Sequence, residues 1–115
     1  MLVTREVSFR ARHSHKGMIL EPEHEHEFTV LITIKGEPNE EGFIVDFRAI
    51  KRLFLRAIAE LEGKNLDTIF EYPTSENLAV WIGERLAPFF PLHLVEVREK
   101  PHSRVIFSRR EANGA

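Results

Sequence analysis

The chain has 115 residues and no cysteine, which excludes disulfides, thiolate metal sites and thiol nucleophiles. It lacks a signal-like apolar stretch at its N-terminus and any run of about 18 apolar residues, so we expect a cytoplasmic protein without a membrane segment. Positive charge is not concentrated either. Sixteen Lys and Arg face 18 Asp and Glu, for a formal net charge of −2, and no basic stripe stands out. We therefore expect no nucleic-acid partner.

The composition is that of an ordinary globular protein. Hydrophobic residues make up 43% of the chain and charged residues 30%, and neither an internal repeat nor a low-complexity segment is present. A chain of this length forms one core, so we predict a single domain over residues 1–115.

The most informative stretch is residues 21–28, together with His13 a short loop upstream. His24 and His26 are two residues apart, so on an extended strand their side chains point to the same face. That face is the apolar one, because the residues that continue the same parity are Phe28, Val30, Ile32 and Ile34. The two histidines are therefore expected at the start of a strand, on its core side.

The preceding stretch, residues 2–13, repeats this alternation and ends on His13. The residues that share its parity are Val3, Val7, Phe9 and Ala11. A hairpin-like loop then brings three imidazoles to the inward edge of two strands, an arrangement known from catalytic zinc sites with one open position. Iron or another divalent metal is an alternative, since imidazole binds several. The other histidines, His15, His93 and His102, are expected on the surface or in loops.

The rest of the chain predicts two helices followed by two strands. Asp46 is a helix cap for an apolar stripe that runs to Leu61, and Gly63 is the stop. Residues 43–45 are interpreted as a short strand end. Thr74 or Ser75 caps a second helix, which ends before Pro88. Strand-like residues 94–97 and 105–107 then flank a hairpin tip at 101–103.

The predicted element order, ββααββ, indicates an α+β fold: a four-stranded antiparallel sheet with both helices on one face. The other face is not polar throughout, because Leu31 and Leu94 lie on it. Two-layer domains of this kind pair their sheet edges with copies of themselves, so we expect a homo-oligomer.

Six motifs in this order resemble one family, that of 6-pyruvoyl-tetrahydropterin synthase and 6-carboxy-tetrahydropterin synthase. They are FRARH (9–13), HEH (24–26), GFIVDF (42–47), LEGKNLD (61–67), PTSENLA (73–79) and VRE (97–99), and they cover almost the whole chain. The His-x-His pair with its upstream histidine and the 73–79 block are the most specific. The resemblance implies the tunnelling fold, in which ββααββ subunits join into a barrel as trimers or hexamers.

The resemblance also implies the chemistry and the residues of the site. His13, His24 and His26 correspond to the zinc ligands, and the substrate is a dihydropterin made from GTP. Glu99 corresponds to the carboxylate that anchors the pterin ring, whose guanidine-like edge offers two parallel donors. Thr74 and Ser75 are expected to line the pterin pocket. Glu99 also has a plainer interpretation, as a strand-end carboxylate paired with Arg98 or Lys100.

Three positions depart from the family pattern. Leu20 stands where the standard enzymes have the cysteine that acts as the base, and Gly63 where they have an assisting histidine. Glu25 replaces the glycine between two ligands. Glu21 or Glu23 is a candidate replacement base, because relatives with a glutamate near the cysteine position cleave dihydroneopterin triphosphate to 6-hydroxymethyl-dihydropterin, a folate-type precursor.

The hypothesis is therefore a zinc-dependent lyase acting on 7,8-dihydroneopterin triphosphate, with Glu21 or Glu23 moving the proton in a retro-aldol cleavage. A non-catalytic pterin- and zinc-binding homologue is the alternative, and a synthase giving a 6-pyruvoyl or 6-carboxy product is a third. The pathway (folate-, biopterin- or queuosine-type) stays open. The four glutamates at 21, 23, 25 and 27 are otherwise a solvated acidic stretch, which is the preferred interpretation of Glu25 and Glu27.

Overall fold

The computed structural model describes residues 1–13 and 24–108. Its main elements follow the predicted order ββααββ: β1 (Leu2–His13), β2 (His24–Lys35), α1 (Phe47–Ala57), α2 (Ser75–Leu86), β3 (Leu92–Lys100) and β4 (Ser103–Phe107). Two short 3₁₀ turns, η1 (Ile58–Glu60) and η2 (Leu66–Thr68), lie between the helices. No helix in the described ranges is long and apolar enough to cross a membrane.

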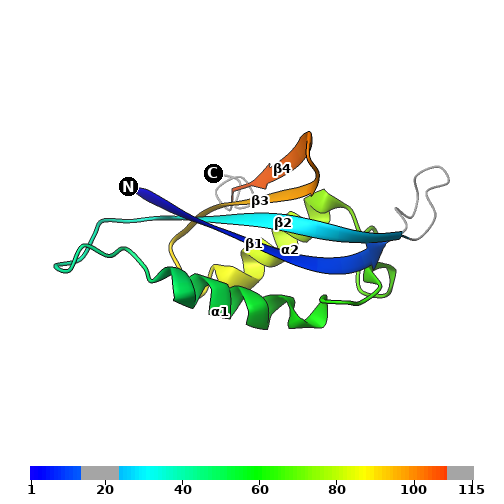
Figure 1. Ribbon diagram of the computed structural model, residues 1–115, viewed down its shortest axis with the longest axis horizontal. Helices are drawn as coiled ribbons and strands as arrows, with labels where there is room; N and C mark the ends of the chain where they lie inside the picture. Colours follow the sequence, from blue (N-terminus) through cyan, green and yellow to red (C-terminus); the bar gives the residue numbers. More distant parts are fainter. Residues whose placement is uncertain (14–23, 109–115) are drawn as a thin grey trace.

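The four strands form one antiparallel sheet in the order β1-β2-β3-β4, and both helices cover the same face of it (Figure 1). This confirms the predicted α+β layer arrangement. The two 12-residue strands β1 and β2 pair along their whole length, from Leu2 opposite Lys35 to His13 opposite His24. The C-terminal end of β1 and the N-terminal end of β2 therefore lie side by side.

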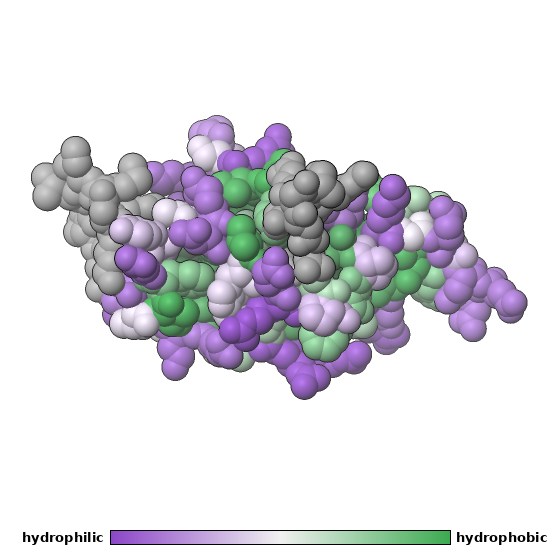
Figure 2. Space-filling model, turned by 180° about the vertical axis from the view of Figure 1, so that it is seen from behind, coloured by the Kyte–Doolittle hydropathy of each residue, from purple (hydrophilic) through white to green (hydrophobic). Residues whose placement is uncertain are grey.

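The core lies between the sheet and the helices, and the predicted alternation in β1 and β2 is what builds it. Phe9 and Phe28 sit opposite each other in the register and stack with ring centroids 5.2 Å apart. The helices contribute the fully buried residues Ile50, Phe54, Ala79, Ile82 and Leu86 to this core. On the side of the molecule drawn in Figure 2, hydrophobic patches are interspersed with hydrophilic side chains.

Both helices begin at capping side chains that the sequence indicated. The Asp46 carboxylate accepts a hydrogen bond from the backbone N–H of Arg48, and its hydrogen bonds to Arg48 lower the pKa of Asp46. Thr74 caps α2, because its hydroxyl accepts from the N–H of Asn77 at 3.1 Å. The choice between Thr74 and Ser75 as the cap is thus settled for Thr74.

Helix α2 packs closely on the last strand at Gly83. A Cβ atom built on Gly83 would lie 2.7 Å from Cε2 of Phe107, which is buried on β4. The absence of a side chain at Gly83 therefore lets α2 lie close to β4. The helical pattern of the sequence does not indicate this close approach.

Two local predictions need correction. Residues 43–45 form no strand, because a loop closes before them: Asn39 Oδ1 accepts from the N–H groups of Glu41 and Phe43, and Phe43 is left 56% exposed. The segment between the helices also contains η2, which was not expected. The Asn65 side chain starts this turn by accepting from the N–H of Asp67.

The outer edge of β1 is covered over only part of its length. The N–H of Arg12 donates to Lys64 O at 2.9 Å, and Arg10 O accepts from Gly63 N–H at 2.7 Å, so residues 63–65 run beside Arg10 and Arg12. In an antiparallel pair the outward backbone groups recur every second residue, at Leu2, Thr4, Glu6 and Ser8. Within the described residues no strand lies beside that first half of β1.

Candidate metal and pterin site

The site lies where β1 ends and β2 begins. In the register His13 is opposite His24 and Ala11 is opposite His26, so His13 and His26 are diagonal neighbours on the core face. Their ring centroids are 5.0 Å apart, and the His13 ring also packs edge-on against Phe28 at 5.4 Å. The strand parity read from the sequence has therefore brought two of the three predicted ligands together.

The His13 ring is held in a fixed orientation. It is fully buried, and its Nδ1 lies 2.9 Å from the carbonyl oxygen of Pro73, in the segment before α2. A carbonyl oxygen only accepts, so Nδ1 carries the proton and donates it. The other ring nitrogen, Nε2, is then directed into the site, where it is the atom that a metal would bind.

Glu99 supplies the third side chain of the cluster. Its Oε1 lies 2.5 Å from His13 Nε2 and 3.1 Å from His26 Nε2, and its Oε2 accepts from Ser75 Oγ at 3.4 Å. Only 14% of the Glu99 side chain is exposed. Arg98 forms its ion pair with Glu96 instead. Glu99 therefore belongs to the histidine cluster, on the same side of β3 as the buried Val95 and Val97.

The electrostatics of this cluster act on His13. Burial alone would lower the pKa of His13, but the hydrogen bonds with Glu99 and with the Pro73 carbonyl, and the negative charges of Glu99 and Asp67, outweigh it. The pKa of His13 is consequently raised above its ordinary value. In the absence of a metal, a proton on Nε2 satisfies the contact with the Glu99 carboxylate.

The donor set fits a divalent metal. Two imidazole nitrogens and one carboxylate oxygen, from His13, His26 and Glu99, all lie within 4.8 Å of one another. Nitrogen and oxygen donors of this kind are those that zinc accepts. The Cα of His24 pairs with that of His13 in the register. The side chain of His24 lies outside the described part of the chain, so its role as third histidine ligand stays a prediction.

The predicted substrate residues lie around this cluster. Ser75 contacts Glu99 directly, whereas the hydroxyl of Thr74 is engaged in capping α2 one residue earlier. The candidate bases Glu21 and Glu23 lie outside the described residues, as does His15. Glu25 and Glu27 are exposed and pair with Arg10 at 3.0 and 3.5 Å, which agrees with their interpretation as a solvated strand face.

Two features of the site were not expected from the sequence. The first is the contact between His13 and the carbonyl oxygen of Pro73, in the 73–79 motif. Any residue type carries a backbone carbonyl, so the sequence gives no sign of this contact. The direct contact of Glu99 with both imidazoles was also missed, although parity placed all three side chains on one face. The signal for this contact in the sequence is a carboxylate of core-facing parity on the strand next to β2.

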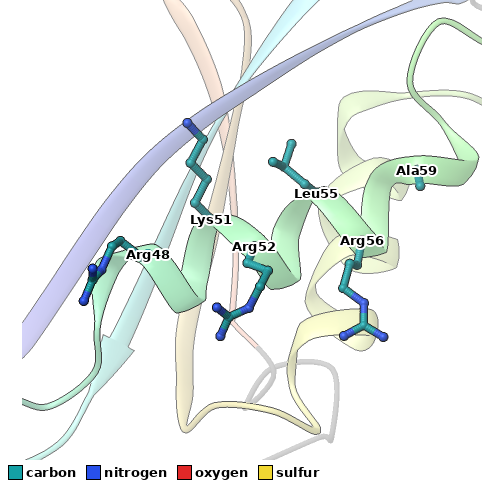
Figure 3. Close-up of a pocket in the computed structure, with 6 residues that line it drawn as sticks. All are labelled: Arg48, Lys51, Arg52, Leu55, Arg56 and Ala59. Carbon is teal, nitrogen blue, oxygen red and sulfur yellow. The ribbon is translucent and has the colours of Figure 1, made fainter.

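A shallow cavity of about 490 Å³ lies elsewhere, on the outer face of α1 (Figure 3). All of its lining residues come from residues 48–59, and four of them are cations: Arg48, Lys51, Arg52 and Arg56. None of the lining residues offers a carboxylate to a pterin edge. We therefore place the candidate substrate site at the Glu99 cluster and not in this groove.

Comparison with known proteins matches this arrangement to one family. The sequence profile described as 6-pyruvoyl tetrahydropterin synthase matches residues 2–110. The structure is similar to that of Caenorhabditis elegans 6-pyruvoyl tetrahydropterin synthase, with a TM-score of 0.82, 20% identity and coverage of 94% of each chain. At this identity the likeness establishes the fold, which is the tunnelling fold of that enzyme.

Two archaeal relatives are closer in sequence. A dihydroneopterin monophosphate aldolase of Pyrococcus furiosus is 36% identical over 84 residues, which is 73% of each chain. An Archaeoglobus fulgidus protein, provisionally named 6-carboxy-5,6,7,8-tetrahydropterin synthase, is 35% identical over 92 residues, or 76% of each chain. The two relatives carry different activities in their names.

Proposed function

Because the chain belongs to the 6-pyruvoyl tetrahydropterin synthase family, we propose that it is a zinc-dependent lyase that cleaves the side chain of a phosphorylated 7,8-dihydroneopterin. The substrate is the triphosphate or its monophosphate, and the pterin product is 6-hydroxymethyl-dihydropterin. The likeness to a dihydroneopterin monophosphate aldolase supports this choice of reaction within the family.

The observation that carries the proposal is the convergence of His13, His26 and Glu99. His13 and His26 would hold the metal through their Nε2 atoms, with His24 as the third histidine ligand. When bound, zinc would act as a Lewis acid toward the side-chain hydroxyls of the substrate. The Pro73 carbonyl keeps the His13 ring in the tautomer and orientation that this role requires.

Glu99 would anchor the pterin. A carboxylate accepts two parallel hydrogen bonds from the 2-amino group and the ring N–H. Ser75 supports this role because its hydroxyl donates to Oε2 of Glu99. Thr74 would act through the position of α2, whose first turn carries Ser75 toward the carboxylate.

Glu21, or alternatively Glu23, would move the proton that starts the cleavage. The base removes the proton from the hydroxyl on the second side-chain carbon, and the bond between the first and second carbons breaks. The second carbon leaves as an aldehyde, and the first carbon regains a proton to become the hydroxymethyl group. The absence of cysteine supports a carboxylate base, since the residue at the usual thiol position is Leu20.

We further propose that the protein acts as a homo-oligomer, a trimer or a hexamer. In the part of the chain that the structure describes, no strand pairs with the first half of β1 at one edge of the sheet, and the short strand β4 forms the other edge. Such edges are suited to pairing with copies of the same chain. The cytoplasmic location stays a prediction of the sequence.

A second candidate function is pterin and zinc binding without catalysis. The feature that favours it is the loss of the standard proton-transfer residues, with Leu20 and Gly63 at the usual cysteine and histidine positions. A synthase yielding a 6-carboxy or 6-pyruvoyl product is the third, and the likeness to the Archaeoglobus fulgidus protein favours it.

The decisive experiment is turnover of zinc-loaded protein with dihydroneopterin triphosphate and monophosphate, with the products identified by mass spectrometry. We expect 6-hydroxymethyl-dihydropterin from the wild type and at least a hundredfold slower turnover from Glu21→Gln, roughly the contribution of a general base. The matched control is Glu25→Gln, which changes an exposed glutamate of the same acidic stretch and should keep full activity. A carboxy or pyruvoyl product would overturn the lyase proposal, and pterin binding without any product would favour the binder.

A further inference from the structure

We propose that the β3–β4 hairpin carries a binding site for a phosphate group, built by Arg98 and Arg104. The two arginines line a concavity of about 200 Å³. The hairpin tip closes it with Pro101, His102 and Ser103. This concavity is separate from the histidine cluster and from the groove on α1, and the proposed lyase mechanism makes no use of it.

The strand register places both arginines on the sheet face that the helices do not cover. Val97 pairs with Val105, and Val97 is buried in the core. Because successive strand residues point to opposite faces, the neighbours Arg98 and Arg104 project away from the core. The regular pairing of β3 with β4 is interrupted between Val97 and Lys100, which is where the concavity lies.

A buried carboxylate holds the guanidinium group of Arg98 by a hydrogen bond and attracts that of Arg104. Glu96 is only 8% exposed; its Oε2 lies 2.5 Å from Nε of Arg98, and its Oε1 lies 3.7 Å from Nη1 of Arg104. One negative charge is thus shared by two positive charges. Among the described residues these three side chains form no further ion pair, so the group carries one positive charge in excess. Arg98 spends a single N–H on Glu96, so the outer donors of its planar fork stay available to a ligand.

Phosphate is the ligand class that these donors suit. Guanidinium groups bind the tetrahedral oxygens of phosphate through paired N–H donors, and the hydroxyl of Ser103 adds a further donor. Because Glu96 already orients Arg98, that side chain loses little conformational entropy when a ligand binds. The concavity also exceeds the volume of one phosphate group, so it has room for part of an esterified molecule.

The phosphate has two possible sources, the phosphorylated pterin substrate or free phosphate and other phosphate esters. Arg98 directly precedes Glu99 in β3, and the two side chains face opposite sides of the sheet. The phosphate site and the metal cluster are therefore close in the sequence but open to different faces. The substrate source rests on the proposed function, whereas the binding of phosphate itself does not.

The test of the site is a calorimetric titration of the purified protein with inorganic phosphate at constant ionic strength. Saturable binding by the wild type is expected to weaken roughly tenfold or more in Arg104→Gln, because a charge-assisted contact is lost. Arg104→Lys, which keeps the charge without the planar fork, should be intermediate. The matched control is Arg52→Gln, an exposed arginine of α1 away from the hairpin. No saturable binding by the wild type, or equal weakening in both glutamine variants, would overturn the proposal.

The source of the phosphate is decided by steady-state kinetics with dihydroneopterin monophosphate and unphosphorylated dihydroneopterin. If the site holds the substrate phosphate, Arg104→Gln raises KM for the phosphorylated compound by the same factor as it weakens phosphate binding, and leaves the other KM unchanged. Unchanged KM values for both compounds would reject this source and assign the site to free phosphate or another ester. Failure of the wild type to turn over either compound would count against the proposed function alone, since the titration is independent of turnover.

Discussion

Nε2 of His13 and Oε1 of Glu99 lie 2.5 Å apart, so the proposed metal ligand and the proposed pterin anchor are in direct contact. A proton on His13 satisfies this contact in the metal-free protein, and a metal that binds Nε2 would have to displace it. Binding of metal and binding of pterin therefore act on the same pair of side chains.

The first prediction separates the two roles open to Glu99. Glu99→Gln keeps the shape of the side chain but removes its charge, so pterin affinity should fall at least tenfold while the protein still binds zinc. The measurement is fluorescence titration with a pterin, alongside metal content by mass spectrometry. Glu27→Gln, on the exposed face of β2, is the control. Loss of zinc with normal pterin affinity would instead make Glu99 a metal ligand.

The second prediction concerns the number of histidine ligands. His13→Ala, His24→Ala and His26→Ala should each lose the bound zinc on dialysis, because three imidazoles are needed to hold the metal with one position open. His93→Ala should retain one zinc per chain. Melting temperatures recorded for each variant separate metal loss from unfolding at the fully buried His13. A His24 variant with full zinc content would limit the histidine ligands to two.

The third prediction is a pH dependence of the metal-free protein. The pKa of His13 is raised above its ordinary value of 6.5, so the folded state binds the proton more tightly than the unfolded state does. This contribution to stability is complete below pH 6.5 and is lost as the pH rises through the raised pKa. The melting temperature followed across this range should fall in the wild type. A His13→Gln variant with the same pH profile would assign the effect to another group.

The pH dependence of zinc binding should be opposite to that of the stability of the metal-free protein. The metal requires neutral His13, so zinc affinity is expected to rise with pH over the same range and one proton should be released on binding. Titrations in buffers of different ionisation enthalpy count this proton. Zinc binding that does not change with pH would contradict a role for His13 as ligand.

The fourth prediction concerns Thr74, which caps α2 beside the site. Thr74→Ala should lower the free energy of unfolding by about 1 kcal/mol, since the first turn of α2 loses its side-chain acceptor. Thr74→Ser keeps a hydroxyl in the same place and should match the wild type in both stability and pterin affinity. Chemical denaturation and pterin titration give the two quantities. Weak pterin binding by the serine variant would show that the methyl group of Thr74 contacts the ligand.

The fifth prediction tests the contact between α2 and β4. Gly83→Ala should destabilise the fold by about 1 kcal/mol, because overpacking against Phe107 outweighs the gain in helix propensity. When Phe107→Leu is already present, adding Gly83→Ala should lower the free energy of unfolding by less than it does in the wild type. Additive changes in the free energy of unfolding would mean that the ring of Phe107 moves aside freely.

Much of the fold was predictable because its main signal is periodic. Alternation in β1 and β2 identified which side chains face the core, and that parity alone put His13 and His26 on one face. The cap at Asp46, and the choice of Thr74 or Ser75 for the second helix, followed from residue types that compete for backbone N–H groups. Strand alternation and helix caps depend on residues that are close together in the sequence, so the sequence alone indicates them.

The features that were missed depend on contacts between distant segments. The Pro73 carbonyl reaches His13 across 60 residues of sequence, and a backbone oxygen has no residue type to announce it. Residues 43–45 have strand-forming side chains, but the loop closed by Asn39 overrides that preference. The shared pairing of Glu96 with two arginines likewise arises only when β3 and β4 meet.

The partial cover on the outer edge of β1 has a consequence for aggregation. A 12-residue edge strand is a long template on which another chain can add by backbone pairing. Residues 63–65 occupy that template at Arg10 and Arg12, so strand addition has to stop before the metal cluster. Among the described residues, the first half of β1, residues 2–8, is left for a seam, and it is long enough to pair with the five residues of β4. The segment between the helices thus protects the end of β1 that carries His13 from misdirected pairing.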